Sequence, residues 1–296
     1  MYKRQTTTTE TESDTGYGGA VLVPDDDTDD PNGDTDTDEE PEPVTDGDTV
    51  VENFDAPLGE NWGVYDGPGH AGKGIRSPSA MTVSNGVLTI TGDANGTTGG
   101  MAWRQGRAKY GRWEARVRAP VADPSYNALA LLWPDAEDFP VGGEIDFMEI
   151  TDETRQQVEF FLHYGRDNSQ DHGSVEIDAT RWHTWAVEWT ETAIVAYVDG
   201  QEWYRNTDTS HFPPRSMHLT LQLDWFPKGD NSVQQSTMQV DWVSYTPLGG
   251  AAPTVTNSDG GAQNDAQNDD AQNDDLRNDD AQVDGADENP PADDDN

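Results

Sequence analysis

One stretch of the sequence indicates both the fold and the candidate site: Gly142-Gly143-Glu144-Ile145-Asp146-Phe147-Met148-Glu149-Ile150. It sets three acids among large apolar residues, a pattern that favours a half-buried β-strand. An ionised carboxylate in such a strand costs on the order of several kcal/mol unless it is paired or hydrogen-bonded. The stretch therefore indicates that these acids are retained for chemistry.

The spacing of the acids predicts an irregularity in the strand. Alternate residues of a regular strand share a face, so Glu144 and Asp146 point the same way and Phe147 points the opposite way. Glu149 has the wrong parity, because it lies an odd number of positions after Glu144. One extra residue, a β-bulge near Phe147 and Met148, would return Glu149 to the face of the other two acids. We therefore predict a bulge here and three acids in a row along one cleft.

Carboxyl groups that share a face suit the hydrolysis of glycosidic bonds. A retaining enzyme needs a nucleophile and an acid/base about 5–5.5 Å apart. Closely placed acids also push their pKa values apart, so that one stays protonated while another ionises. The alternative is a solvated edge strand that carries acids because the whole chain is acidic. The interleaved Ile, Phe and Met residues favour the half-buried strand instead.

Residues 143–150, GEIDFMEI, resemble the active-site signature of glycoside hydrolase family 16, in the form with an extra residue before the last Glu. Endo-β-1,3-glucanases (laminarinases), agarases and carrageenases share that form. The resemblance implies that Glu144 is the nucleophile and Glu149 the general acid/base. It also implies that Asp146 tunes and orients both glutamates.

Three more blocks resemble the family in the same order, so that the resemblance covers roughly residues 50 to 248. They are residues 110–116, residues 182–189 with 198–200, and residues 240–243. The resemblance implies a secreted, retaining endo-β-glycan hydrolase that cleaves β-1,3- or mixed β-1,3/1,4-glucan. A transglycosylase, an agarase- or carrageenase-type galactan hydrolase, and a non-catalytic lectin-like module stay open as alternatives.

Many short stretches of alternating or continuous apolar residues follow one another between Val50 and Tyr245. Asn85-Gly86 and Asp199-Gly200 are typical hairpin turns between them. No stretch longer than a turn or two has convincing helical periodicity. The sequence therefore predicts an all-β fold, an antiparallel β-sandwich jelly roll, and we expect a concave substrate cleft on it.

The charge of the chain predicts its domain organisation. The net charge is −41, and residues 1–47 and 251–296 carry −13 each. The first segment is rich in Thr, Asp and Pro and the second in Asp, Asn and Gln, so neither buries enough apolar surface to fold. We predict disordered acidic tails around a catalytic domain at 48–250. Residues 1–5 resemble a translated sequencing adapter, so we expect the natural N-terminus to be missing.

The same composition limits the partners and the compartment. A strongly negative surface repels nucleic acid and anionic membranes, and it is typical of proteins from salt-loving organisms. No run is apolar enough to span a membrane, and the absence of Cys excludes disulfides and thiolate metal sites. We expect an extracellular or cell-surface monomer that acts on a polysaccharide, although no signal peptide is visible.

Sugar rings stack on aromatic side chains, so aromatic residues near the acids are candidate subsites, with core packing as the alternative. His163 resembles the family's cleft histidine. Where laminarinases usually carry Trp-Pro, this chain has Phe139-Pro140, which leaves another neutral glycan or a sulfated galactan open as the substrate. A sulfated substrate would need basic contacts, for which Arg104, Arg107 and Arg155 are the candidates. The predicted substrate-binding residues are Trp133, Phe139, His163, Trp103, Arg104, Trp225 and Trp185.

No cofactor is expected for catalysis, because no His pair has metal-ligand spacing. The resemblance implies a structural Ca²⁺ ion on the convex face, held by Asp241 with Glu52 and the Gly86 carbonyl. Oxygen ligands suit calcium. The alternative for Asp241, an acid on an otherwise apolar strand, is a hydrogen bond to the backbone.

Overall fold

The computed structural model describes residues 49–228, 233–257 and 262–264. The tails predicted at 1–47 and, from residue 265 on, near the C-terminus lie outside the described residues. Apart from three single-turn 3-10 helices, the regular elements described are β-strands. The helices are η1 (His70–Gly72), η2 (Pro78–Ala80) and η3 (Thr209–His211).

Sheet A contains seven of the described strands and carries the three acids. Its strands are β2 (Trp62–Val64), β8 (Gly100–Trp103), β10 (Tyr126–Pro134), β11 (Glu144–Ile150), β12 (Gln157–Tyr164), β13 (Ser169–Glu176) and β17 (Met217–Trp225). They pair in the order β13-β12-β11-β10-β17-β8-β2, and every pair is antiparallel.

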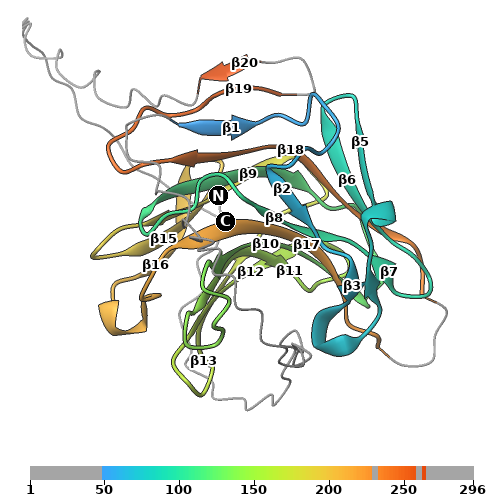
Figure 1. Ribbon diagram of the computed structural model, residues 1–296, viewed down its shortest axis with the longest axis horizontal. Coiled ribbons are helices and arrows are strands. Elements are labelled where there is room, and N and C mark those ends of the chain that lie inside the picture. The colour runs from blue at the N-terminus through green and yellow to red at the C-terminus, as the bar shows by residue number, and fades with distance from the viewer. Residues whose placement is uncertain (1–48, 229–232, 258–261, 265–296) are drawn as a thin grey trace, which may run out of the picture. The chain divides into compact units, whose positions relative to one another are not determined.

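Sheet B packs against sheet A as the second layer (Figure 1). Its strands are β1 (Val50–Glu52), β5 (Met81–Ser84), β6 (Val87–Gly92), β9 (Gly111–Arg118), β14 (His183–Trp189), β15 (Ile194–Val198), β16 (Gln201–Asn206) and β18 (Ser236–Thr246). The order is β16-β15-β14-β9-β18-β6-β5, and β1 also pairs with β18. The predicted hairpin turn at Asn85-Gly86 joins β5 to β6, and the one at Asp199-Gly200 joins β15 to β16.

The inner faces of the two sheets form one hydrophobic core. On β17 the alternate residues Leu219, Leu221 and Leu223 are fully buried, and on β9 Trp113 and Val117 meet them from the other sheet's side of the core. Alternation of this kind is what an antiparallel sandwich requires, because each strand gives one face to the core. The predicted all-β antiparallel sandwich is confirmed.

Two smaller sheets complete the described part. The first joins β3 (Gly67–Pro68), β4 (Ile75–Arg76) and β7 (Thr97–Thr98), and it lies at one end of sheet A. The second pairs β19 (Thr254–Thr256) with β20 (Ala262–Asn264).

The ordered part continues past the predicted boundary at residue 250. Val255 is 2% exposed, and Asn257 Oδ1 accepts a hydrogen bond of 3.0 Å from Trp242 Nε1. This segment therefore packs on the domain rather than belonging to the tail. The sequence missed it because a single buried valine among polar residues has no periodicity to detect.

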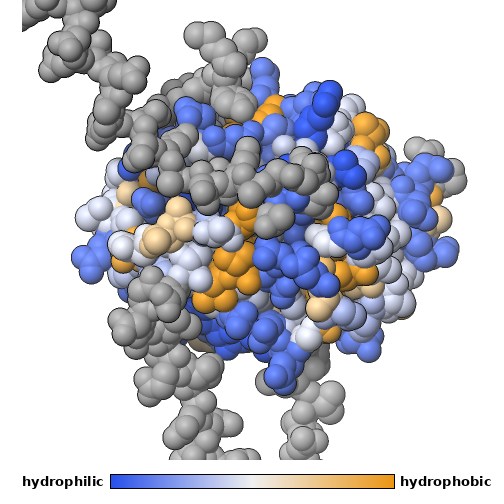
Figure 2. Space-filling model, turned by 90° about the horizontal axis from the view of Figure 1, so that it is seen from above, coloured by the Kyte–Doolittle hydropathy of each residue, from blue (hydrophilic) through white to orange (hydrophobic). Residues whose placement is uncertain are grey.

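The exterior matches the polar composition. On the face shown in Figure 2 most of the coloured residues are hydrophilic, with small apolar patches between them. Among the described residues, no helix has the length and apolarity that crossing a membrane requires.

Candidate active site

The predicted bulge is present and brings the acids together. On β11, Asp146 lies opposite Phe161 of β12 and Glu149 lies opposite Glu159, so β11 holds one residue more than its partner. The register against β10 shifts at the same point, where Met148 follows Asp146 in the pairing. Phe147 and Met148 are both fully buried in the core. The bulge therefore returns Glu149 to the outer face of sheet A, the face turned away from the core.

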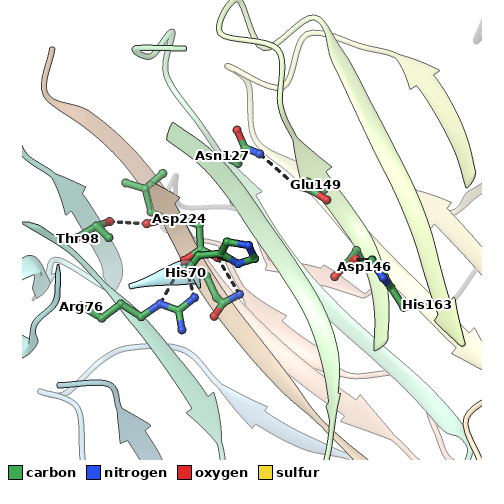
Figure 3. Close-up of polar contacts among 10 residues, drawn as sticks. His70, Arg76, Thr98, Asn127, Asp146, Glu149, His163 and Asp224 are labelled. Carbon is green, nitrogen blue, oxygen red and sulfur yellow. Dashed lines mark hydrogen bonds and ion pairs between the residues drawn. The ribbon is translucent and has the colours of Figure 1, made fainter. Parts of the chain in front are cut away.

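Glu149 has an amide partner on the next strand. Asn127 Nδ2, on β10, donates a hydrogen bond of 3.2 Å to Glu149 Oε1 (Figure 3). Asn127 was not predicted as a site residue. Strand parity could have identified it, because Asn127 lies an even number of positions before Trp133 on the same strand and therefore shares the face of that predicted site residue.

Asp146 has a histidine partner on the other side. His163 Nε2 lies 3.3 Å from Asp146 Oδ2, and the two side chains lie on the neighbouring strands β12 and β11 (Figure 3). His163 is also directly opposite Glu144 in the register. On its far side, His163 Nδ1 lies 2.9 Å from Asn168 Oδ1, in the turn that leads to β13. The histidine is therefore fixed at both ring nitrogens.

The surroundings shift the ionisation of all three acids upward. Burial, reinforced by the charge of Asp146, raises the pKa of Glu144 well above its usual range. Burial raises the pKa of Asp146 to about 8. Burial and then the charge of Asp146 raise the pKa of Glu149 to about 8. Glu149 therefore holds a proton at neutral pH, as a general acid requires.

An aromatic wall borders the acids at one end. Trp133 at the end of β10 stacks on Phe139 with ring centroids 5.2 Å apart, and Phe139 lies 5.8 Å from the ring of His163. Trp133 Nε1 donates to Glu137 Oε2 at 2.8 Å, which fixes the indole. Both aromatic rings are half-buried. Trp133, Phe139 and His163 thus lie together beside the acids, and their contact with a substrate stays a prediction.

An ion-paired aspartate that the sequence did not reveal lies on the same sheet. Asp224 of β17 is 2% exposed, and Arg76 Nη2 binds its Oδ1 at 2.6 Å. His70 Nδ1 lies 3.9 Å from Asp224 Oδ2, so β4 and the turn before it are held onto sheet A (Figure 3). Asp224 was missed because it is one acid among many in an acidic chain.

A second carboxylate–histidine pair lies beyond Glu149. Glu159 on β12 accepts from Thr151 Oγ1 at 2.6 Å and lies 3.1 Å from His172 Nε2. The ring of His172 stacks on Phe161 at 4.7 Å. The sequence left His172 without a role, because strand pairing alone brings it next to Glu159.

Three of the predicted tryptophans lie elsewhere. Trp103 is fully buried and Trp185 is 1% exposed, both within the core cluster, so their prediction as sugar contacts was wrong. Trp225 follows Asp224 and so has the opposite parity, and its ring packs so closely on Gly96 that a Cβ atom there would overlap it. It therefore supports the end of the sheet. Tryptophan content alone does not separate core from surface positions.

The predicted cationic contacts have protein partners. Arg104 is exposed, and its Nη1 donates to the Glu60 carbonyl at 3.0 Å. Arg107 Nε lies 3.7 Å from Asp135 Oδ1. Arg155 is fully buried and donates to the carbonyls of residues 126, 150 and 152. Arg155 is therefore a structural residue, and its assignment to a sulfated substrate was wrong.

Two of the three predicted calcium ligands, Asp241 and Glu52, are engaged with the protein. Arg116 Nη1 lies 2.6 Å from Asp241 Oδ2, and Glu52 accepts from the Phe54 N–H at 2.9 Å and from Trp62 Nε1 at 3.3 Å. A guanidinium on Asp241 fits poorly with a calcium ion on the same carboxylate, since calcium needs six to eight oxygens. The calcium ion stays a prediction.

Comparison with known proteins gives a consistent picture. The family model described as glycosyl hydrolases family 16 matches residues 72–244. A beta-glucanase of Rhodothermus marinus is 30% identical over 135 residues, 38% of this chain and 47% of that protein. Glucan endo-1,3-beta-glucosidase A1 of Niallia circulans is 31% identical over 162 residues, 46% of this chain and 24% of that protein. The chain thus spans less than half the length of these relatives.

The fold is shared with solved structures. A prokaryotic beta-1,3-1,4-glucanase (lichenase) derived from a mouse hindgut metagenome superposes with a TM-score of 0.59 at 21% identity. The match covers 67% of this chain and 99% of that one. At this identity the likeness shows the fold, which agrees with the two-sheet architecture described above.

Proposed function

The chain belongs to the glycosyl hydrolases family 16, and on that basis we propose that it is an endo-acting β-glucanase that cleaves β-1,3- or mixed β-1,3/1,4-glucan with retention of configuration. The observation that carries the proposal is the bulge in β11. It puts Glu144, Asp146 and Glu149 on one face, where all three pKa values are raised. Beta-glucanase activity in the names of two relatives supports the substrate class.

In the first step we assign Glu144 as the nucleophile and Glu149 as the general acid. Glu149, with a pKa of about 8, carries a proton at neutral pH and delivers it to the glycosidic oxygen as that bond breaks. Glu144 in its ionised form attacks the anomeric carbon and forms a glycosyl-enzyme ester. Asp146, whose pKa is raised to about 8, keeps the single proton of the Glu144–Asp146 pair, so the one negative charge of the pair lies on Glu144.

In the second step Glu149, now ionised, takes a proton from water. The hydroxide formed displaces Glu144 from the anomeric carbon, and the sugar leaves with its original configuration. Asn127 stabilises the ionised form of Glu149 by its hydrogen bond, so it acts in this step in particular. A sugar hydroxyl in place of water would give transglycosylation on the same site.

A neutral glucan suits the surroundings of the acids better than a sulfated galactan. Trp133 and Phe139 offer apolar faces on which a pyranose ring can stack. Arg107 faces Asp135, and Arg76 faces Asp224, so these two cations are already neutralised. The net charge of −41 further opposes a polyanionic substrate.

The experiment is an incubation of the full chain with laminarin, lichenan, agarose and carrageenan at low and molar salt, with new reducing ends as the readout. We expect release from laminarin or lichenan, and proton NMR of the first products should show the β-anomer. Glu144→Gln should lower kcat at least about 10³-fold while glucan binding persists. Binding without release by the unmodified chain would instead establish a lectin-like module, and product longer than the substrate a transglycosylase.

Polymeric glucans do not cross cell membranes, so we propose that the enzyme acts outside the cell, as a monomer, in a saline habitat. The acidic composition supports the last point, because added salt screens self-repulsion between surface carboxylates. Activity that rises with salt up to the molar range, and a sedimentation mass equal to that of one chain, are the expected results. Activity that falls with added salt would contradict the saline habitat.

A further inference from the structure

Three side chains with different donor chemistry meet on the outer face of sheet A. The ligand atoms of Glu144, Asp146 and His163 all lie within 4.8 Å of one another. Two carboxylate oxygens and one imidazole nitrogen form a donor set that binds zinc, with one position left for water. The proposed hydrolysis uses the two acids but needs no ion at this point.

The distance between the donor atoms of His163 and Asp146 fits a zinc ion with tetrahedral ligands. With Zn–N and Zn–O bonds of about 2.0–2.1 Å, tetrahedral ligands lie about 3.3–3.4 Å from each other. The distance from His163 Nε2 to Asp146 Oδ2 is 3.3 Å. An ion can therefore be held by this pair without displacing either strand, and the Glu144 carboxylate lies within 4.8 Å of both donor atoms as the third ligand.

The hydrogen bonds around His163 leave the correct nitrogen available. The oxygen of the Asn168 amide can only accept, so its contact with His163 Nδ1 puts a proton on that nitrogen. In the neutral imidazole, Nε2 then presents a lone pair to Asp146. An amide or carbonyl oxygen on the second nitrogen is the usual partner of a metal-bound histidine. Two lone pairs that face each other require a proton or a metal ion between them.

Asp146 has a buried carboxylate oxygen that faces no hydrogen-bond donor in the described part of the chain. Its side chain is 3% exposed, and its Oδ1 atom is buried without a hydrogen-bond donor among the described residues. A buried oxygen of this kind gains more from a cation than a solvated one does. Glu144 and His163 are half-buried, so an ion can enter from solvent.

We propose that Glu144, Asp146 and His163 bind one Zn²⁺ ion, which reversibly inhibits the enzyme. The bound ion occupies the carboxylate oxygens with which Glu144 would attack, so the ester to the sugar cannot form while zinc is present. The inhibition rests on the proposed function, whereas zinc binding does not.

The test uses the full chain, freed of metals with a chelator, and titrates it with ZnCl₂ by calorimetry. We expect weak, non-specific binding of Zn²⁺ to the acidic surface and, in addition, one Zn²⁺ ion per chain that binds more tightly, the tight equivalent. His163→Ala should weaken that equivalent at least about tenfold, because an imidazole ligand is lost. His172→Ala is the matched control, since His172 also faces a carboxylate on this sheet, and it should keep the tight equivalent.

A second variant and a second readout distinguish loss of the zinc site from loss of the fold. Asp146→Asn preserves the shape of the side chain and should also lose the tight equivalent, while thermal unfolding shows that each variant is folded. Co²⁺ in place of zinc should give the intense visible absorption of a four-coordinate ion in the wild type and not in His163→Ala. Equal zinc affinity in the wild type and His163→Ala, or no tight equivalent in the wild type, would overturn the proposal.

Measurements of enzyme activity separate the proposed zinc site from the proposed glucanase function. Zinc should inhibit glucan hydrolysis competitively in the wild type and in His172→Ala, and chelator should restore the rate. Tight zinc binding that depends on His163, in a chain that cleaves no glycan, would leave the metal site standing and refute the proposed function.

Discussion

Asn127 donates its side-chain N–H to Glu149 across the β10–β11 pair, at 3.2 Å, and so favours the charged form of an acid whose burial favours the neutral one. The two effects oppose each other, and burial is the larger. The balance sets the pH above which Glu149 no longer holds the proton that the first step needs.

Removal of this donor should move the alkaline limit of activity. In Asn127→Ala the pKa of Glu149 rises further, because its charged form loses a hydrogen bond. Activity is lost as pH rises through this pKa, so the alkaline limb of kcat/KM should shift from about 8 to higher pH. The matched control is Asn206→Ala, whose amide binds Asp171 instead, and it should leave the limb in place. A limb that moves to lower pH would contradict the assignment of Glu149 as the acid.

Asp146 should make the protein less stable as pH rises. Its pKa is about 8 when folded and 3.8 as a model group. Between these values the folded state holds a proton that the unfolded state releases, so this group lowers the free energy of unfolding as pH increases. Asp146→Asn removes the effect, and unfolding measured with chelator present should show a gain that grows from pH 4 to pH 8, reaching about 2 kcal/mol.

Asp208 provides a control, because its contribution to stability should change with pH in the opposite direction. Hydrogen bonds from Ser210 lower the pKa of Asp208. This group adds stability above its unfolded pKa and loses it as pH falls through the folded one. Asp208→Asn should therefore cost stability at neutral pH and nothing in acid. The same pH trend in both variants would show that the effect at Asp146 is a general charge effect.

Trp133 and Trp185 should respond differently to the same substitution. Trp133 is half-buried beside the acids, so Trp133→Ala should raise KM for glucan about tenfold with a small change in unfolding temperature. Trp185 is 1% exposed in the core, so Trp185→Ala should cost about 3–5 kcal/mol of unfolding free energy. Steady-state kinetics and denaturant titrations of both variants test this difference. An unchanged KM in Trp133→Ala would show that Trp133 does not contact the substrate.

The Arg116–Asp241 pair should contribute to stability through charge neutralisation. Asp241 is 2% exposed, and Arg116 also stacks over Trp182 at 5.1 Å. Arg116→Met leaves a buried carboxylate without this partner and should cost about 3–5 kcal/mol in denaturant titrations. Calcium tests the same carboxylate. Because Arg116 already neutralises it, chelation should change the unfolding temperature of the wild type little, and a large drop would support the predicted calcium ion instead.

The sequence alone determined the all-β sandwich and the bulge in β11, because both follow from the two-residue period of strands. The odd spacing of Glu149 from Glu144 is incompatible with a shared face unless one residue is added. Flanking apolar residues then decide which face is buried. Local pattern was sufficient here, since strand parity depends only on neighbours in the chain.

Tertiary structure alone decided which polar residues surround those acids. Asn127, Asn168 behind His163, and the Arg76–Asp224 pair come from strands and turns far apart in the sequence, and only the strand order and register bring them near the acids. It also decided that Trp103 and Trp185 face the core and that Trp133 does not. Periodicity gives the face of a strand relative to its own neighbours, but what covers that face depends on packing between segments that the sequence does not place.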